Sequence, residues 1–272
     1  YTGALWVSGA NVKETLGKFP AIRPTMLVAV PGICEILMGL VKMYGKEFLG
    51  GQLRFIIAGA ANVPPKLIKE FDSVGISLFA GYGMTEAGNL TSGNIDVVEK
   101  PTSVGKIYPG QEIKLVDGEI WIKGDNVFLG YYGDPEKTAE VLTEDGWLKT
   151  GDLGRFDDEG YMYITGRIKN LIILSNGENV SPESLEEPFY KCDKLKDCLV
   201  KEDEHDGRNV IAIEILPRME EFANTPWEEV EKYFNNLLVE VNNTLPTTHR
   251  ISKLTVRKED FKRTGTLKVS RN

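Results

Sequence analysis

Three apolar segments separated by two helical patterns constrain the fold of this 272-residue chain most strongly. "PTMLVAVPG" (24–32) and "LRFIIAGAA" (53–61) have the uninterrupted apolar pattern of strands buried on both faces, and "ISLFAGYG" (76–83) predicts a third strand. Between them, 33–45 carries apolar residues at helical spacing, and 64–75 begins with prolines and ends at a glycine. This alternation predicts a parallel α/β sheet, which binds ligands outside the carboxyl ends of its strands.

From about residue 103 the pattern changes to hairpins. In "IKLVDGEIWIKG", Asp117 and Gly118 stand between two alternating segments, which predicts a two-residue hairpin turn. A second hairpin is predicted for 154–167, and a compact α+β module follows it. We therefore expect two domains. The first, 1–168, combines the parallel sheet with a small β-rich subdomain, and the second, 169–272, is a small α+β domain of ordinary size.

Composition argues against several classes of protein. The formal net charge of -8 leaves no basic excess for a nucleic-acid backbone. The three cysteines lack disulfide or zinc spacing, so reduced thiols in the cytoplasm are the simplest interpretation. Neither of the two histidines, His205 and His249, adjoins a nucleophile motif, which argues against a Ser-His-Asp triad. We find no apolar run of about 18 residues and no signal peptide, so we expect no transmembrane segment.

The strand end "LFAGYGMTEAG" presents the first candidate site. Gly81 and Gly83 bracket Tyr82, but Glu86 stands where a dinucleotide fingerprint needs its last glycine. Flat glycine backbone beside an aromatic ring suits a planar base. Thr85 then offers a hydroxyl to a phosphate, and Glu86 a carboxylate to a magnesium ion. The alternative for this stretch alone is a tight turn with an exposed Thr-Glu pair.

Three later stretches carry polar groups suited to the same chemistry. In "GWLKTGDLG", Asp152 lies on a predicted turn between hairpin elements, where it can accept both hydroxyls of a ribose; the alternative is an Asx-type turn. Arg167 and Lys169 lie at the predicted domain boundary and Gly177 in the loop after it, and the alternative there is a solvated linker. "TGTLKVSR" places Lys268 in a basic tail, whose alternative is a disordered end.

In this order and spacing, these stretches resemble the adenylate-forming superfamily: acyl-CoA synthetases, adenylation domains of peptide synthetases, and luciferases. "GYGMTEAG" is similar to the family's Tyr-Gly-x-Thr-Glu motif, and "GAANVPP" to the preceding strand end that borders the nucleotide and acyl sites. "GWLKTGD" and "GRIKNLIILSNGENVSP" match two further motifs almost completely. The resemblance extends over essentially the whole chain. It implies an α/β fold, namely the C-terminal part of a large adenylate-forming domain followed by a small mobile α+β domain.

The resemblance implies a role for each matching position. Thr85 would contact the phosphate of AMP, Glu86 would bind Mg²⁺, and Asp152 with Arg167 would hold the ribose. Lys169 would be the hinge about which the C-terminal domain rotates, and Gly177 would then line the thiol tunnel. Lys268 would be catalytic, because an ammonium offsets repulsion as the carboxylate approaches the α-phosphate. The nucleotide pocket would be lined by Gly59, Ala60, Gly81, Tyr82 and Gly83.

Two departures from the family pattern bear on this interpretation. Many members carry the catalytic lysine directly after a glycine, whereas here Gly265 is followed by Thr266. The tail resembles instead the Thr-Pro-Thr-x-Lys form of long-chain acyl-CoA synthetases, which favours Lys268 over Lys262. The family's glycine- and Ser/Thr-rich phosphate loop is absent; in the family it lies upstream of the segment that begins here at Tyr1. We therefore expect a chain truncated at its N-terminus and inactive by itself.

The resemblance implies an AMP-forming acid–thiol ligase. The parent protein would use ATP and Mg²⁺ to convert a small carboxylic acid, with a fatty acid as the first expectation, into acyl-AMP. It would then transfer the acyl group to coenzyme A. Two alternatives stay open: transfer to the thiol of a separate carrier protein, and a non-catalytic nucleotide-binding module.

Overall fold

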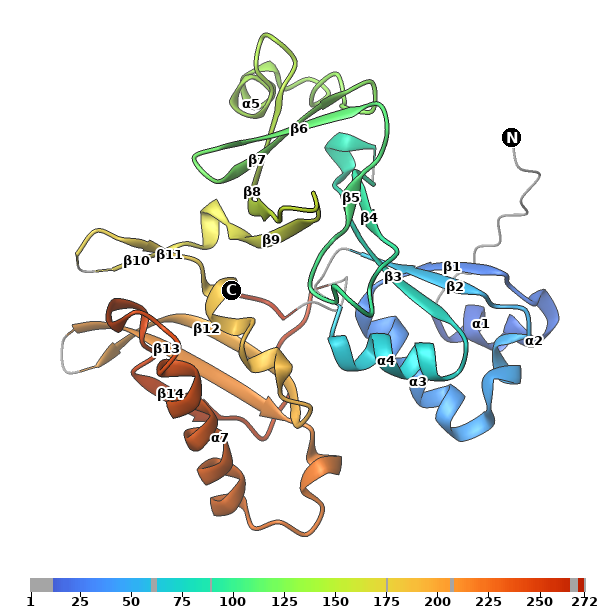
Figure 1. The fold of residues 1–272 in the computed structure, drawn as a ribbon, viewed down its shortest axis with the longest axis vertical. Coiled ribbons are helices and arrows are strands. Elements are labelled where there is room, and N and C mark those ends of the chain that lie inside the picture. The colour runs from blue at the N-terminus through green and yellow to red at the C-terminus, as the bar shows by residue number, and fades with distance from the viewer. Residues whose placement is uncertain are drawn as a thin grey trace. The chain divides into compact units, whose positions relative to one another are not determined.

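The computed structural model describes residues 12–59, 63–88, 90–174, 176–205, 208–264 and 269–271. The chain divides into two compact units, residues 1–81 with 94–102 and residues 82–93 with 103–272. Figure 1 shows the elements of both units. Within the described ranges, we find no helix with the length and hydropathy of a membrane span.

The first unit contains the predicted parallel sheet. Strands β1 (Met26–Ala29), β2 (Phe55–Ala58) and β3 (Ser77–Tyr82) pair in parallel and in chain order. The connections contain the predicted helices, α3 (Pro31–Tyr44) and α4 (Pro65–Ser73), and each begins at a proline, whose fixed φ suits the first turn. Three short helices complete the unit: α1 (Val12–Gly17), α2 (Phe19–Ile22) and the 3-10 helix η1 (Lys46–Leu49).

The core of this unit lies between the sheet and its helices (Figure 1). It is formed by buried residues of α3, α4, β2 and β3: Leu37, Met38, Val41, Leu67, Ile68, Phe71, Ile56 and Leu78. The expectation that the first strand is buried on both faces is wrong. Leu27 and Ala29 pack against the core, whereas Met26 and Val28 alternate with them and are 39% and 58% exposed. The described helices of this unit cover only one face of β1, so every second side chain meets solvent.

The second unit begins with a small β-rich part. The 3-10 helix η2 (Thr85–Ala87) precedes an antiparallel pair, β4 (Ser92–Asn94) and β5 (Lys106–Ile107). An antiparallel meander follows in chain order: β6 (Gln111–Val116), β7 (Glu119–Gly124), β8 (Leu148–Phe156) and β9 (Met162–Arg167), with α5 (Pro135–Val141) between β7 and β8. Asp117 and Gly118 have φ values of 51° and 83°, which confirms the predicted two-residue hairpin.

The C-terminal part of the second unit has its own apolar core. The long strands β12 (Leu195–His205) and β13 (Arg208–Pro217) form an antiparallel hairpin, and β14 (Lys253–Val256) adds to β13 in parallel. Helix α7 (Trp227–Asn242) buries Val230, Phe234 and Val241 in the same core. The smaller elements are η3 (Ile168–Asn170), β10 (Ile172–Ile173), β11 (Asn179–Val180), α6 (Pro182–Glu186), η4 (Phe189–Lys191), η5 (Met219–Phe222) and η6 (Thr247–His249).

Two apolar clusters lie on either side of the predicted domain boundary. One contains Ile120, Ile122, Leu148 and Met162 of the meander, and the other contains residues from Ile172 onward. The boundary between 168 and 169 itself stays a prediction. Ser181 Oγ accepts a hydrogen bond from the Ser184 N–H at 3.4 Å, as an N-cap of α6 does.

Candidate active site

Asp152 lies inside strand β8, so its predicted position on a turn is wrong. Gly151 before it has a φ of 70°, and Thr150 Oγ1 donates to the Ile120 carbonyl at 2.7 Å while accepting from the Asp152 N–H at 3.1 Å. The Thr150 hydroxyl therefore replaces a ladder bond where the β7–β8 register shifts, and the strand continues. The alternative, an Asx-type turn, is wrong for the same reason, because Asp152 continues the strand and pairs with Arg167 of β9.

Two side chains from other strands hold the Asp152 carboxylate. Tyr82, the last residue of β3, donates its hydroxyl to Oδ2 at 2.8 Å, and Arg167 Nε lies 2.6 Å from Oδ1. Asp152 and Arg167 are register partners on β8 and β9, so the backbone ladder fixes their spacing. Tyr82 is buried, whereas the Arg167 side chain is 47% exposed. The structure thus brings together three of the predicted site residues and leaves the group open on the Arg167 side.

The electrostatics of this cluster suit a hydroxyl-binding carboxylate. Burial, and after it the negative charge of Asp152, raises the pKa of Tyr82 far above its ordinary value. The Tyr82 hydroxyl therefore stays protonated and donates at physiological pH. A carboxylate has about four lone-pair directions, and Tyr82 and Arg167 occupy two of them. Among the described residues, only Tyr82 and Arg167 are recorded as side-chain partners of the Asp152 oxygens, so the carboxylate keeps acceptor capacity there.

Thr85 and Glu86 lie on the short helix η2, with Thr85 exposed and Glu86 half-buried. The segment after β7 fixes this turn. The Phe128 N–H donates to the Glu86 carbonyl at 2.8 Å, Asn126 Nδ2 donates to the Ala87 carbonyl at 2.8 Å, and the Tyr131 hydroxyl donates to Glu86 Oε1 at 3.0 Å. Burial, followed by this hydrogen bond to Glu86, raises the pKa of Tyr131.

Sequence reasoning missed all three of these supporting residues. Tyr131 and Glu86 are 45 positions apart, and no local pattern links them. The only signal is the run "GYYGDP", in which a tyrosine pair between glycines suggests a fixed loop.

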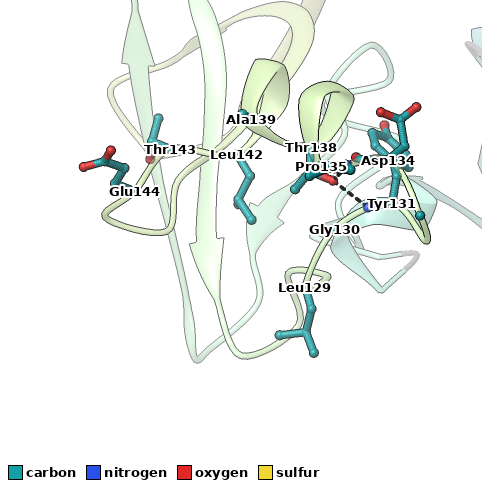
Figure 2. A pocket seen from close by; sticks show the side chains of 11 residues that line it. Leu129, Gly130, Tyr131, Asp134, Pro135, Thr138, Ala139, Leu142, Thr143 and Glu144 are labelled. Atoms are coloured by element: carbon teal, nitrogen blue, oxygen red, sulfur yellow. Dashed lines mark hydrogen bonds between the residues drawn. The ribbon is translucent and has the colours of Figure 1, made fainter.

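A shallow pocket of about 520 Å³ lies beside this loop, between residues 129–135 and α5 (Figure 2). The Tyr131 N–H donates to Thr138 Oγ1 at 2.9 Å, and Asp134 caps α5 by accepting from the Lys137 N–H at 2.9 Å. None of the predicted site residues lines this pocket. Of its polar side chains, Thr138 holds the loop that carries Tyr131, and Asp134 caps α5.

Two predicted nucleotide-binding glycines belong to the first unit. Gly59 directly follows β2, and Gly81 lies in β3. A Cβ atom on Gly59 would lie 3.3 Å from the Gly81 carbonyl oxygen, so the two backbones approach closely. Gly83 follows β3 in the second unit. Ala60 lies outside the described residues.

The hinge and tunnel positions follow β9. Lys169 is exposed on η3, two residues after Arg167. Gly177 lies in the turn between β10 and β11, where its φ of 82° favours glycine and its N–H donates to the Leu174 carbonyl at 2.8 Å. The next residue, Glu178, ties this turn to η6 through Oε1, which lies 2.8 Å from His249 Nε2. Lys268 lies outside the described residues.

Known proteins resemble this chain in sequence and in fold. The family described as AMP-binding enzyme matches residues 4–132. Long chain acyl-CoA synthetase 7, peroxisomal, of Arabidopsis thaliana is 35% identical over 191 residues, which cover 64% of this chain and 27% of the relative. The medium-chain fatty-acid–CoA ligase of Escherichia coli K12 is 33% identical over 264 residues, which cover 88% of this chain and 46% of the relative. An ATP-bound RpMatB-BxBclM chimera of known structure is 27% identical, has a TM-score of 0.76, and is matched over 94% of this chain and 51% of its own.

These similarities, with the fold described above, place the chain in the adenylate-forming superfamily of AMP-binding enzymes. Its curated relatives include acyl-CoA synthetases and fatty-acid–CoA ligases, and the fold confirms the predicted α/β class. The chain spans 27% of the Arabidopsis protein and 46% of the Escherichia coli protein.

Proposed function

We propose that the protein containing this chain is an AMP-forming acid–thiol ligase. It would activate a carboxylic acid with ATP to an acyl-adenylate and would then transfer the acyl group to coenzyme A. The observation that carries this proposal is the buried Asp152 carboxylate, oriented by Tyr82 and Arg167 and with acceptor capacity left for a ribose. The names of the relatives support the same reaction class and favour a fatty acid as the substrate.

In the first half-reaction, different site residues would bind different parts of the nucleotide. The acid's carboxylate oxygen attacks the α-phosphorus, the bond to the bridging oxygen of pyrophosphate breaks, and acyl-AMP and pyrophosphate result. Asp152 and Arg167 would hold the ribose, and Tyr82 with Gly81 and Gly83 would line the adenine pocket. Thr85 would donate its exposed hydroxyl to the α-phosphate.

Glu86 is suited to hold Mg²⁺. Tyr131 occupies Oε1, and among the described residues no hydrogen bond uses Oε2, so one oxygen of a positioned carboxylate remains for a hard cation. When bound, the ion would neutralise charge on the phosphates. Lys268 would add an ammonium at the same centre, where it offsets the repulsion between two anions.

The second half-reaction would follow rotation about Lys169. The coenzyme A sulfur attacks the acyl carbonyl carbon, the bond to AMP breaks, and the thiol proton is released. Lys169 lies two residues after Arg167, the last residue of β9, so the pivot would lie close to the ribose site. Gly177 would line the thiol path after the rotation.

The test is acid-dependent release of pyrophosphate and AMP by the protein that contains this chain, measured over a panel of carboxylic acids with and without coenzyme A. Release that needs a fatty acid and rises with coenzyme A supports the ligase. Pyrophosphate release without a response to coenzyme A would indicate a carrier-protein thiol as acceptor. Nucleotide binding without turnover on any acid would favour the binding module.

We also propose a reducing compartment, the cytoplasm, for this enzyme. Cys34, Cys192 and Cys198 are all unpaired, as thiols in such a compartment are. Fractionation of cells that express the tagged protein tests this; recovery in peroxisomes, which the name of the Arabidopsis relative mentions, would contradict it.

A further inference from the structure

The carboxylate of Glu86 is oriented by a residue from a distant loop. Tyr131 donates its hydroxyl to Glu86 Oε1 at 3.0 Å, across 45 positions of sequence. In the described part of the chain, Glu86 Oε2 has no hydrogen-bond partner. A glutamate side chain loses about 1.5–2 kcal/mol of rotamer freedom when it is fixed. A donor that fixes it beforehand therefore favours the binding of a ligand to the remaining oxygen.

The backbone around Glu86 is fastened to the same loop. The Phe128 N–H donates to the Glu86 carbonyl at 2.8 Å, and Asn126 Nδ2 donates to the Ala87 carbonyl at 2.8 Å. Ala87 is buried in the apolar cluster of the meander, and Phe128 packs against that cluster. The backbone and the side chain of Glu86 are thus held by one segment, 126–131, which is itself anchored in the core.

Tyr131 is in turn held by its neighbours. Its N–H donates to Thr138 Oγ1 at 2.9 Å (Figure 2), and the Thr138 hydroxyl donates to the Asp134 carbonyl at 2.8 Å. The ring of Phe128 meets the Tyr131 ring edge-on, with 5.0 Å between centroids, and Lys137 Nζ lies 5.2 Å from the Tyr131 centroid. A tyrosine side chain has only two torsions, so these contacts restrict where its hydroxyl can lie.

We propose that Tyr131 is a positioning residue for the metal site: it fixes the Glu86 carboxylate and leaves Oε2 for the ion that Glu86 would bind. This inference rests on the function proposed above and adds to it a residue that touches neither the substrates nor the ion. Tyr131 acts through Glu86. Residues that orient a metal ligand through a hydrogen bond typically contribute about ten- to a hundredfold in metal affinity or activity.

The experiment compares Tyr131→Phe with Tyr132→Phe in the protein that contains this chain. Tyr132 is the matched control, because it is the adjacent tyrosine and its side chain is fully exposed. Calorimetry measures the affinity for ATP with Mg²⁺ and with a chelator, and the ratio of the two affinities measures the coupling between ion and nucleotide. The affinity for AMP without metal reports whether the nucleotide pocket is intact. Pyrophosphate release is then followed against the Mg²⁺ concentration.

We expect Tyr131→Phe to lower the affinity ratio about tenfold or more, while the affinity for AMP stays within about twofold of the wild type. The Mg²⁺ concentration that gives half-maximal pyrophosphate release should rise by a similar factor, and saturating Mg²⁺ should restore kcat. Tyr132→Phe should change none of these quantities. If Tyr131 only packed the loop, its loss would weaken AMP binding or lower kcat even at saturating Mg²⁺, and that result would overturn the inference.

A double-mutant cycle with Glu86→Gln tests whether Tyr131 acts through Glu86. Adding Tyr131→Phe to Glu86→Gln should change the affinity ratio by less than about twofold, because the carboxylate that the hydroxyl orients is already gone. Additive losses in the double variant, or a wild-type protein whose ATP affinity does not depend on Mg²⁺, would overturn the inference. A wild-type protein that shows the Mg²⁺ dependence but releases no pyrophosphate with any acid would refute the proposed function, while the affinity ratios still decide the role of Tyr131.

Discussion

The hydrogen bond between Tyr82 and Asp152 makes a quantitative prediction. Tyr82→Phe removes the donor at 2.8 Å from a carboxylate that is 3% exposed and keeps the ring in place. Hydrogen bonds to charged groups contribute about 1.5–3 kcal/mol, and Arg167 remains at the other oxygen, so we expect a loss of about 2 kcal/mol in the free energy of unfolding. Tyr131→Phe is the matched control. Its hydroxyl also donates to a carboxylate, but that site is only partly buried, so we expect less than about 1 kcal/mol.

Urea unfolding followed by tryptophan fluorescence measures both variants. Trp121 lies in β7 and Trp147 just before β8, so their emission reports on the meander that contains Asp152. The slope of the free energy against urea should not change, because neither variant alters the surface that unfolding exposes. If Tyr82→Phe destabilises the protein no more than Tyr131→Phe, the buried hydrogen bond does not stabilise this site as we reason.

Three further predictions follow from single contacts. Asp152→Ala should weaken ATP binding about tenfold or more, by calorimetry, and unchanged affinity would remove Asp152 from the ribose site. Burial raises the pKa of Glu186 from 4.5 to about 7 on folding. Ionisation of Glu186 should therefore lower the free energy of unfolding as pH increases through this window, by up to about 3 kcal/mol. Glu186→Gln should remove that dependence in urea titrations at pH 5 and 8; parallel pH profiles of the wild type and the variant would contradict it. Gly166→Ala should destabilise the protein by about 1–3 kcal/mol, because the new Cβ would lie 2.0 Å from Ser181 Oγ. Gly39→Ala in α3, which has open space around it, should stabilise the protein by about 0.5–1 kcal/mol in the same urea assay. Equal effects of the two variants would show that the close approach of Gly166 to Ser181 is not rigid.

Local patterns predicted the elements well, because their causes are local. Asp117-Gly118 adopts the positive φ values that a two-residue hairpin needs, and Ser181 caps α6 as its position before Pro182 indicates. The prediction of a turn at Asp152 was wrong, and the cause is again a local interaction. Thr150 and Gly151 have the composition of a turn, but the Thr150 hydroxyl bonds the neighbouring strand and lets β8 continue.

Local sequence patterns could not predict which side chains are buried or which distant residues are in contact. The apolar run at β1 does not reveal that the side chains of Met26 and Val28 are exposed. Tyr131 supports Glu86 from 45 residues away, and Arg271 supports α6 from 85 residues away. Such pairs depend on how the elements pack, which a single sequence does not encode in its spacing. The positions recognised through the family resemblance, Tyr82, Asp152 and Arg167, are brought together, but their roles toward a nucleotide stay predictions.

The bond between Tyr82 and Asp152 also has a consequence for folding kinetics. It joins positions 70 residues apart, so its formation requires the closure of a long loop. Contacts of such sequence separation form slowly, since the entropy of closing the loop is lost before the contact contributes. A nucleotide that binds this carboxylate would bind only the closed state and would stabilise it by mass action. The concentration of such a nucleotide, relative to its Kd, would then set how far the equilibrium shifts toward the folded form.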